Sequence, residues 1–178
     1  LEESAFKIAN TDLTLEICEK VQSIDKHIPI IFSSSVQALC NNPYGKSKLD
    51  AESALLKFQE DTGNKVYIYR LPGVFGKWSK PNFNSVVATF CHNVSLRLPL
   101  KIDNPAHELQ LVFIDDVVEA FVRIIQGQHD NSNECTIQPH YKVKLGDLAA
   151  QIRLFKESRG SLISERVGNG FIRKLYST

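Results

Sequence analysis

Short apolar runs along this chain alternate with longer segments in which apolar residues recur at helical spacing. The runs at 28–32, 66–69 and 109–114 predict buried strands, and residues 134–138 predict a shorter one. Helical spacing predicts helices over residues 4–23, 43–60, 84–95 and 145–157, and over the segment between Asp115 and Gly127. Because strands alternate with helices, the pattern predicts an α/β domain with a mainly parallel sheet.

Local signals mark several of these boundaries. Asn42 followed by Pro43 is typical of a helix start, because asparagine caps well and proline suits the first turn. Gly63 and Gly127 are typical of helix ends. Asp115-Asp116 predicts a cap for the helix that follows it.

The predicted sheet also indicates where a ligand would bind. In open α/β sheets, ligands lie outside the carboxyl ends of the strands. That rule selects Ser33–Ser35, Leu71–Gly76 and Ile114–Asp116.

Candidate chemistry lies beside the first of these strand ends. Tyr44 and Lys48 are four residues apart on a predicted helix, so their side chains share one face. An ammonium group near a phenol stabilises phenolate, and the tyrosine can then exchange a proton with an alcohol oxygen. Ser35 could hydrogen-bond that same oxygen. The tyrosine-lysine pair alone also suits an ordinary surface helix, but the serine triplet at the strand end favours a site that moves a proton while a cofactor moves hydride.

Composition excludes some functions. The 178 residues are 43% apolar and 23% charged with a net charge of +1, which gives no strong attraction to nucleic acid or anionic membranes. No apolar run approaches the roughly 18 residues of a membrane span. We therefore expect no nucleic acid and no membrane as partner.

The cysteines give no sign of a metal centre. Cys18, Cys40, Cys91 and Cys135 are widely spaced without a C-x-x-C pair, so we expect reduced thiols in a cytoplasmic protein and no bound metal. The chain begins with Leu1 and contains no methionine, which favours a piece of a longer protein.

Several motifs together resemble the extended short-chain dehydrogenase/reductase family of nucleotide-sugar epimerases and reductases. The resemblance covers about residues 4–127, and its motifs are Ile31–Ser35, Asn42–Lys48, Tyr69–Gly76 and Val112–Val117. Three further stretches are similar to bacterial capsular-polysaccharide bifunctional enzymes on the route to UDP-N-acetyl-L-fucosamine: Gly76–Cys91, Val143–Leu148 and Leu175–Thr178. In those enzymes a reductase domain precedes a zinc-binding cupin domain.

The resemblance implies a role for each catalytic candidate. Tyr44 would be the general acid, Lys48 would stabilise its phenolate and hold the nicotinamide ribose, and Ser35 would bind the reacting oxygen. Asn10 matches the asparagine of the family's tetrad, which helps to hold a proton-relay water.

It also implies binding residues and a reaction. Pro72, Gly73 and Val74 would lie against the nicotinamide, although the family usually carries asparagine where Gly73 stands. Asn82 and Asn84 would contact the sugar nucleotide, and a solvated loop explains each of them equally well. The implied reaction is reduction of a 4-keto, 6-deoxy UDP-N-acetylhexosamine by NADPH (or NADH).

For the fold, the resemblance implies part of a Rossmann-like, doubly wound parallel sheet. Residues 1–127 would form the C-terminal part of the cofactor-binding domain with the active site, and 128–178 a small substrate-side subdomain. No G-x-x-G-x-x-G turn precedes residue 4, so we expect the main pyrophosphate-binding surface to lie outside this chain. The family commonly dimerises through helices matching 4–23 and 43–61, which implies a homodimer.

Two other functions remain open at this point. One is a nucleotide-sugar epimerase or dehydratase of the same family. The other is a non-catalytic dimerisation or binding module, although such modules usually lose the tyrosine or the lysine, and this chain keeps both Tyr44 and Lys48. A Cys91-His92 nucleophile pair is disfavoured because adjacent side chains diverge on a helix.

Overall fold

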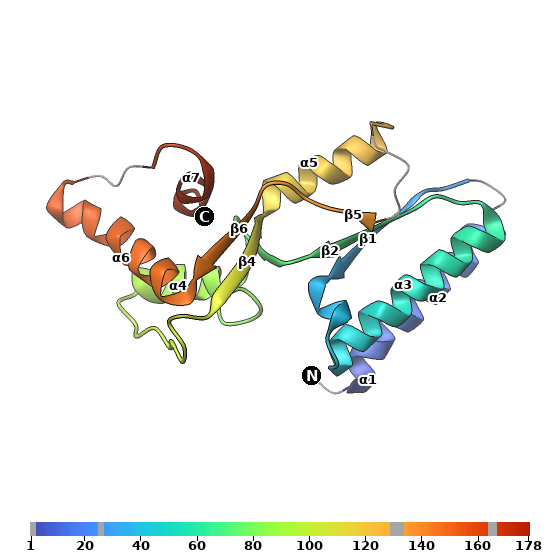
Figure 1. Ribbon diagram of the computed structural model, residues 1–178, viewed down its shortest axis with the longest axis horizontal. Helices are drawn as coiled ribbons and strands as arrows, with labels where there is room; N and C mark the ends of the chain where they lie inside the picture. Colours follow the sequence, from blue (N-terminus) through green and yellow to red (C-terminus); the bar gives the residue numbers. More distant parts are fainter. Residues whose placement is uncertain (1–2, 25–26, 129–133, 164–166) are drawn as a thin grey trace. The chain divides into compact units, whose positions relative to one another are not determined.

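The computed structural model describes residues 3–24, 27–128, 134–163 and 167–178. Contacts between residues divide the chain into two compact units. The first comprises Leu1–Pro72 and Arg123–Ile137, and the second comprises Gly73–Val122 and Gln138–Thr178. Figure 1 shows the fold and labels most of its helices and strands.

The first unit contains a parallel sheet with β2 (Val66–Leu71) in the middle. β1 (Ile30–Ser35) pairs with β2 from Ile30 opposite Val66 to Ser35 opposite Leu71, and the short β5 (Glu134–Cys135) pairs with the other edge of β2. Since β1 and β2 run in register, their carboxyl ends meet at the same edge of the sheet, where the sequence predicts a ligand site.

Helices of the first unit come from two segments. The first segment is continuous and consists of α1 (Glu3–Phe6), the π-helical η1 (Lys7–Asp12) and α2 (Leu13–Ser23). The second consists of the 3-10 helix η2 (Val36–Leu39) and α3 (Pro43–Thr62). α2 and α3 lie side by side (Figure 1), and the core of this unit contains Cys18, Leu55, Phe58, Val66 and Ile68.

Local chemistry explains where α3 begins and ends. The Asn42 side chain accepts a hydrogen bond from the Gly45 N–H at 2.8 Å, and Pro43 occupies the first helical position. Gly63 ends the helix in the left-handed conformation, with φ of 71°, which a residue with a Cβ adopts at a cost. Both predicted boundaries of this helix are confirmed.

The second unit contains a mixed sheet. β4 (Glu108–Phe113) pairs in parallel with β3 (Gly73–Phe75) and antiparallel with β6 (His140–Lys144). Its helices are α4 (Val86–Ser95), α6 (Leu145–Ser161), α7 (Gly170–Tyr176) and most of α5 (Ile114–Ile125), whose residues from Arg123 on belong to the first unit. The core of this unit comprises Phe75, Val87, Phe90, Leu111, Phe113, Leu148, Ala149, Ile152 and Leu175.

The α/β fold class is confirmed, and most predicted elements are present with shifted ends. The pattern missed β3, β6 and α7, and it missed the π-helical character of η1. The prediction that Asp115-Asp116 caps a helix is wrong: α5 starts at Ile114, directly after β4, so both aspartates lie in its first turn. The predicted boundary near residue 127, between a cofactor-binding part and a substrate-side subdomain, stays a prediction. The division into two compact units does not show which part binds substrate.

Candidate active site

The carboxyl end of β1 carries three consecutive serines with different environments. Ser34 is buried, whereas Ser33 is exposed and Ser35 is partly buried, as expected when successive side chains of a strand point to opposite faces. Ser35 also caps η2, because its Oγ accepts a hydrogen bond from the Gln37 N–H at 3.2 Å. The Ser35 hydroxyl keeps its own proton available for donation to another oxygen.

Tyr44 and Lys48 lie in the first two turns of α3, as the sequence predicts. The Tyr44 ring packs edge-on against Phe6, with 5.5 Å between ring centroids. Lys48 reaches from α3 to β1: its Nζ donates a hydrogen bond to the Ser33 carbonyl oxygen at 3.0 Å and lies 4.8 Å from the centre of the Phe32 ring. The same Nζ is 6.0 Å from the Tyr44 ring centre, so one ammonium group links the strand end to the tyrosine.

The electrostatics of Lys48 reflect two opposing influences. Burial lowers its pKa, and the Glu52 carboxylate raises it. An ammonium group has three N–H donors, and the Ser33 carbonyl oxygen uses one of them. Lys48 therefore has the donors to hold ribose hydroxyls of a dinucleotide, so the residues present fit such a cofactor.

Gly45 lets η2 approach the start of α3. A Cβ at this position would lie 2.1 Å from the Gln37 carbonyl oxygen and 2.7 Å from the Cys40 carbonyl oxygen, so no larger residue fits without backbone movement. The missing side chain next to Tyr44 thus allows the segment that follows Ser35 to pack against α3.

Asn10 lies in η1, and its side chain contacts α3. Its Nδ2 donates to the Ser47 Oγ at 3.0 Å, and the Ser47 Oγ donates to the Tyr44 carbonyl oxygen at 2.8 Å. Single-turn π segments occur frequently at functional sites. The predicted role of Asn10 in holding a proton-relay water stays a prediction.

The predicted binding residues divide between the two units. Pro72 ends the first segment of the first unit, whereas Gly73, Val74, Asn82 and Asn84 belong to the second. The roles of these five residues stay predictions.

In the second unit, local contacts explain the glycine at position 73 and the position of the loop that carries Asn82 and Asn84. A Cβ on Gly73 would lie 3.0 Å from Leu111 Cδ2 and 3.2 Å from the Gln110 carbonyl oxygen, so close packing of β3 on β4 favours glycine there. Asn82 and Asn84 are exposed, and Asn82 has a left-handed backbone, with φ of 56°. The Asn82 N–H donates to Thr89 Oγ1 at 2.9 Å, which ties the loop to α4.

The sequence analysis missed a buried carboxylate behind the site. Glu52 lies on α3 one turn after Lys48 and is 2% exposed. It pairs with Arg70 of β2, with 2.6 Å between Arg70 Nη2 and Glu52 Oε2, and it accepts a hydrogen bond from the Ser34 hydroxyl. The signal was available, since Tyr44, Lys48 and Glu52 recur at spacing four and therefore share a helix face.

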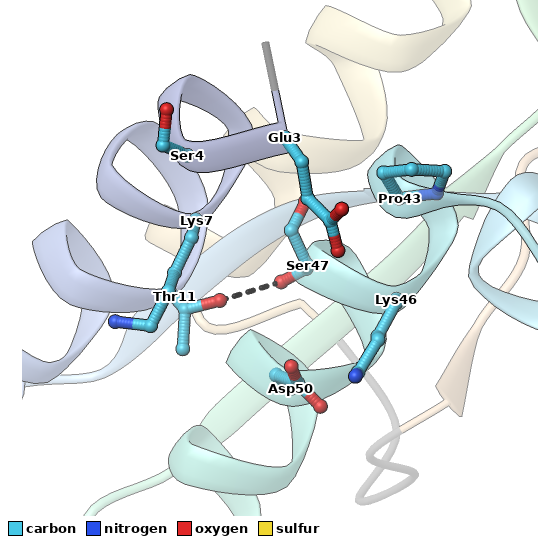
Figure 2. Close-up of a pocket in the computed structure, with 8 residues that line it drawn as sticks. All are labelled: Glu3, Ser4, Lys7, Thr11, Pro43, Lys46, Ser47 and Asp50. Atoms are coloured by element: carbon cyan, nitrogen blue, oxygen red, sulfur yellow. Dashed lines mark hydrogen bonds between the residues drawn. The ribbon is translucent and has the colours of Figure 1, made fainter.

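A pocket of about 200 Å³ lies elsewhere, between α3 and the first helical segment (Figure 2). From α3 it is lined by Pro43, Lys46, Ser47 and Asp50, which lie on a face of the helix rotated roughly 130° from the Tyr44–Lys48 face. Its charged residues are two acids and two lysines, which gives no preference for an anionic nucleotide. We therefore do not assign the candidate chemistry to this pocket.

Two other classes of site, a metal centre and a membrane span, have no counterpart among the described residues. Within the described ranges, no three histidine, cysteine or acidic side chains gather as a metal site would require. Among the helices described, none has the length and apolar character needed to cross a bilayer.

Known proteins resemble this chain in sequence and in fold. Over 173 residues it is 49% identical to a Pseudomonas aeruginosa protein named UDP-2-acetamido-2,6-beta-L-arabino-hexul-4-ose reductase, and this match covers 97% of the chain and 46% of the relative. Its fold is similar to that of the capsular polysaccharide assembling protein CapF from Staphylococcus aureus, with a TM-score of 0.87 and 38% identity over 92% of this chain and 46% of CapF. The chain thus spans about half the length of these relatives.

More distant structures share the fold. The Bordetella bronchiseptica enzyme WbmF, solved in complex with NAD+, superposes with a TM-score of 0.73 at 19% identity and covers 95% of this chain and 63% of WbmF. Residues 5–138, three quarters of the chain, match the NAD dependent epimerase/dehydratase family. This chain, whose α3 carries the Tyr44–Lys48 pair beside the end of the parallel strand β1, belongs to the NAD-dependent epimerase/dehydratase family.

Proposed function

We propose that the full-length protein reduces a 4-keto, 6-deoxy UDP-N-acetylhexosamine, with NADPH as the reductant, to make a precursor of capsular or other surface polysaccharide. The observation that carries the proposal is the position of Lys48, whose ammonium group connects the serine-bearing end of β1 with the Tyr44 ring. The reductase name of the Pseudomonas aeruginosa relative and the capsular role in the name of CapF support the choice of substrate class.

Each site residue then has a defined task. A bound reduced nicotinamide supplies the hydride that adds to the C4 carbonyl carbon. Tyr44 donates its phenolic proton to the C4 oxygen, and the Lys48 ammonium stabilises the phenolate that remains. The Ser35 hydroxyl donates a hydrogen bond to the same oxygen, which favours the charge that develops there.

Other residues hold the parts of the reaction in place. Lys48 offers its remaining N–H donors to the nicotinamide ribose. Pro72, Gly73 and Val74 are proposed to border the nicotinamide, and Asn82 and Asn84 to contact the sugar nucleotide. Asn10 would act behind Tyr44, since its amide reaches the Tyr44 carbonyl through Ser47.

Replacing Tyr44 with phenylalanine tests the proposal. The ring would keep its contact with Phe6, so folding and cofactor affinity should be preserved while kcat falls roughly 100- to 10,000-fold. The measurement is NADPH oxidation at 340 nm in the full-length protein with the 4-keto UDP-sugar. Tyr176→Phe is the matched control, because Tyr176 is exposed on α7. Unchanged turnover in Tyr44→Phe would remove Tyr44 from the mechanism.

An epimerase or dehydratase of the same family is the second candidate, since the matched family includes both activities. Such an enzyme returns the hydride to its substrate and consumes no reduced cofactor overall. Stoichiometric oxidation of NADPH with the keto sugar supports the reductase, whereas product formation at constant absorbance supports the alternative. Repeating the assay with NADH tests the choice of cofactor.

We also propose a cytoplasmic homodimer that uses helices 4–23 and 43–61. Exposed apolar residues on these helices support it, among them Ile8, Leu15, Leu49 and Leu56. Buried apolar surface drives most protein association, so these side chains suit a helix-to-helix interface. Light scattering of the full-length protein gives its mass: a dimer agrees with the proposal, and a monomer at micromolar concentration contradicts it.

A further inference from the structure

A buried carboxylate lies directly behind the tyrosine-lysine pair. Glu52 is 2% exposed, on α3, one turn after Lys48. A carboxylate in the interior is costly unless charges or hydrogen bonds compensate it. Its partners therefore indicate what the residue does.

Those partners come from two neighbouring strands. Arg70 on β2 donates from Nε to both carboxylate oxygens at 3.1 Å and from Nη2 to Oε2 at 2.6 Å. Ser34 on β1 donates a hydrogen bond from its hydroxyl to Oε1. One side chain thus joins α3, β1 and β2 at the edge of the sheet that carries the candidate site.

The hydrogen bond from Ser34 to Glu52 also holds the residues on either side of Ser34 in place. The Ser33 carbonyl oxygen receives the hydrogen bond from Lys48 Nζ, and Ser35 carries the hydroxyl proposed to bind the reacting oxygen. Because the strand side chains alternate, Ser34 points inward to Glu52 while its neighbours face the other side. Movement of Ser34 would therefore displace both the Ser33 carbonyl oxygen, which accepts the hydrogen bond from Lys48, and the Ser35 hydroxyl, which is proposed to bind the reacting oxygen.

The charge of Glu52 acts on Lys48 as well. Burial lowers the pKa of Lys48, and Glu52 opposes that decrease. The other groups around Lys48 in the described part of the chain are Tyr44 on α3, and Phe32 with the Ser33 carbonyl on β1. Of these groups, Glu52 is the anionic one that raises the pKa, and Arg70 on β2 partly neutralises it.

We propose that Glu52 is a positioning residue for the reaction, which holds the serine end of β1 against α3 and places a negative charge one turn from Lys48. The inference rests on the proposed reductase function. Glu52 would touch neither substrate nor cofactor, because its side chain is buried on α3 against Ser34 of β1 and Arg70 of β2.

Two variants separate the two effects. Glu52→Gln keeps the size of the side chain but removes its charge, so the pKa of Lys48 should decrease and kcat should fall roughly tenfold or more. Ser34→Ala removes the hydrogen bond and keeps the charge, so kcat should fall while the pKa of Lys48 stays at the wild-type value. Glu157→Gln is the charge control, because Glu157 is exposed on α6.

The measurements are kcat in the full-length protein, its melting temperature, and the titration of Lys48 by NMR of 13C-labelled lysine, with Lys48→Arg used for assignment. A purely structural Glu52 would lower the melting temperature and leave the Lys48 titration unchanged. An unchanged Lys48 pKa in a folded Glu52→Gln protein overturns the proposal, whatever the loss of rate.

Two further outcomes also test the proposed role of Glu52. Should Glu52→Gln fail to fold, loss of kcat in Ser34→Ala supports the proposal, and unchanged kcat in that variant refutes it. Should the wild-type protein fail to reduce the keto sugar, the proposed function fails, and the Lys48 titration in Glu52→Gln still tests the role of Glu52 independently.

Discussion

Replacing Gly45 with alanine should damage both the stability and the activity of this protein. Gly45 lies next to Tyr44, at the point where η2 packs against α3. An added Cβ would lie 2.1 Å from the Gln37 carbonyl oxygen and 2.7 Å from the Cys40 carbonyl oxygen. Both obstacles are backbone atoms, so no side chain can rotate away to make room.

The size of the effect follows from that geometry. Restoring an ordinary carbon–oxygen contact requires η2 and α3 to separate by about 1 Å. Overpacking of this kind costs about 1–3 kcal/mol, and the better helix propensity of alanine recovers at most about 1 kcal/mol. Because Ser35 precedes η2 and Tyr44 lies on α3, the same displacement should lower kcat up to roughly 100-fold.

Urea unfolding and steady-state kinetics of the full-length protein test this prediction. Gly160→Ala is the matched control: its added Cβ meets nothing within 4 Å, so the variant should keep its activity and gain up to about 1 kcal/mol of stability. A Gly45→Ala protein with wild-type stability and wild-type kcat would refute the packing argument, because it would show that η2 does not constrain α3.

Three smaller predictions concern other contacts. Asn42→Ala removes the cap of α3 and should lower the free energy of unfolding by about 1 kcal/mol in urea. Burial lowers the pKa of Lys174, but hydrogen bonds and charges, those of Asp116 foremost, raise it above its ordinary value. Lys174→Met removes these interactions and should lower the free energy of unfolding by about 2 kcal/mol at pH 7. This stabilisation is complete below the ordinary lysine pKa and disappears as pH rises through the raised value, so wild type and variant should converge in alkaline urea titrations. Iodoacetamide should label exposed Cys40 well before Cys91, whose pKa is raised by burial, and equal rates measured by mass spectrometry would contradict this.

Part of the candidate site could be predicted from sequence because it depends on local geometry. Asn42, Pro43 and Gly63 set the ends of α3 through short-range backbone hydrogen bonds. Within a helix of known register, residues four apart share a face, so the proximity of Tyr44 and Lys48 followed without tertiary information. The α/β fold class followed in the same way from the alternation of strand and helix periods.

Short elements were missed because their local signal is weak. β6 alternates exposed and partly buried residues, as an edge strand should, but its five residues are too few and too charged to separate it from a loop. The start of α5 was misplaced because Asp115 and Asp116 are good caps, whereas the helix follows β4 directly and the two aspartates pair instead with Lys77 and Lys174.

The sequence by itself determined the ends of α3, the shared face of Tyr44 and Lys48, and the serine triplet at the end of a strand, because each depends on residues within a few positions of one another. Only the tertiary structure decided that Lys48 bonds to the Ser33 carbonyl oxygen and that Glu52 is buried between Ser34 and Arg70. Those contacts join residues 15 and 18 positions apart. Their partners depend on which strand lies beside α3, and that is decided by burial of the whole core and not by any local pattern.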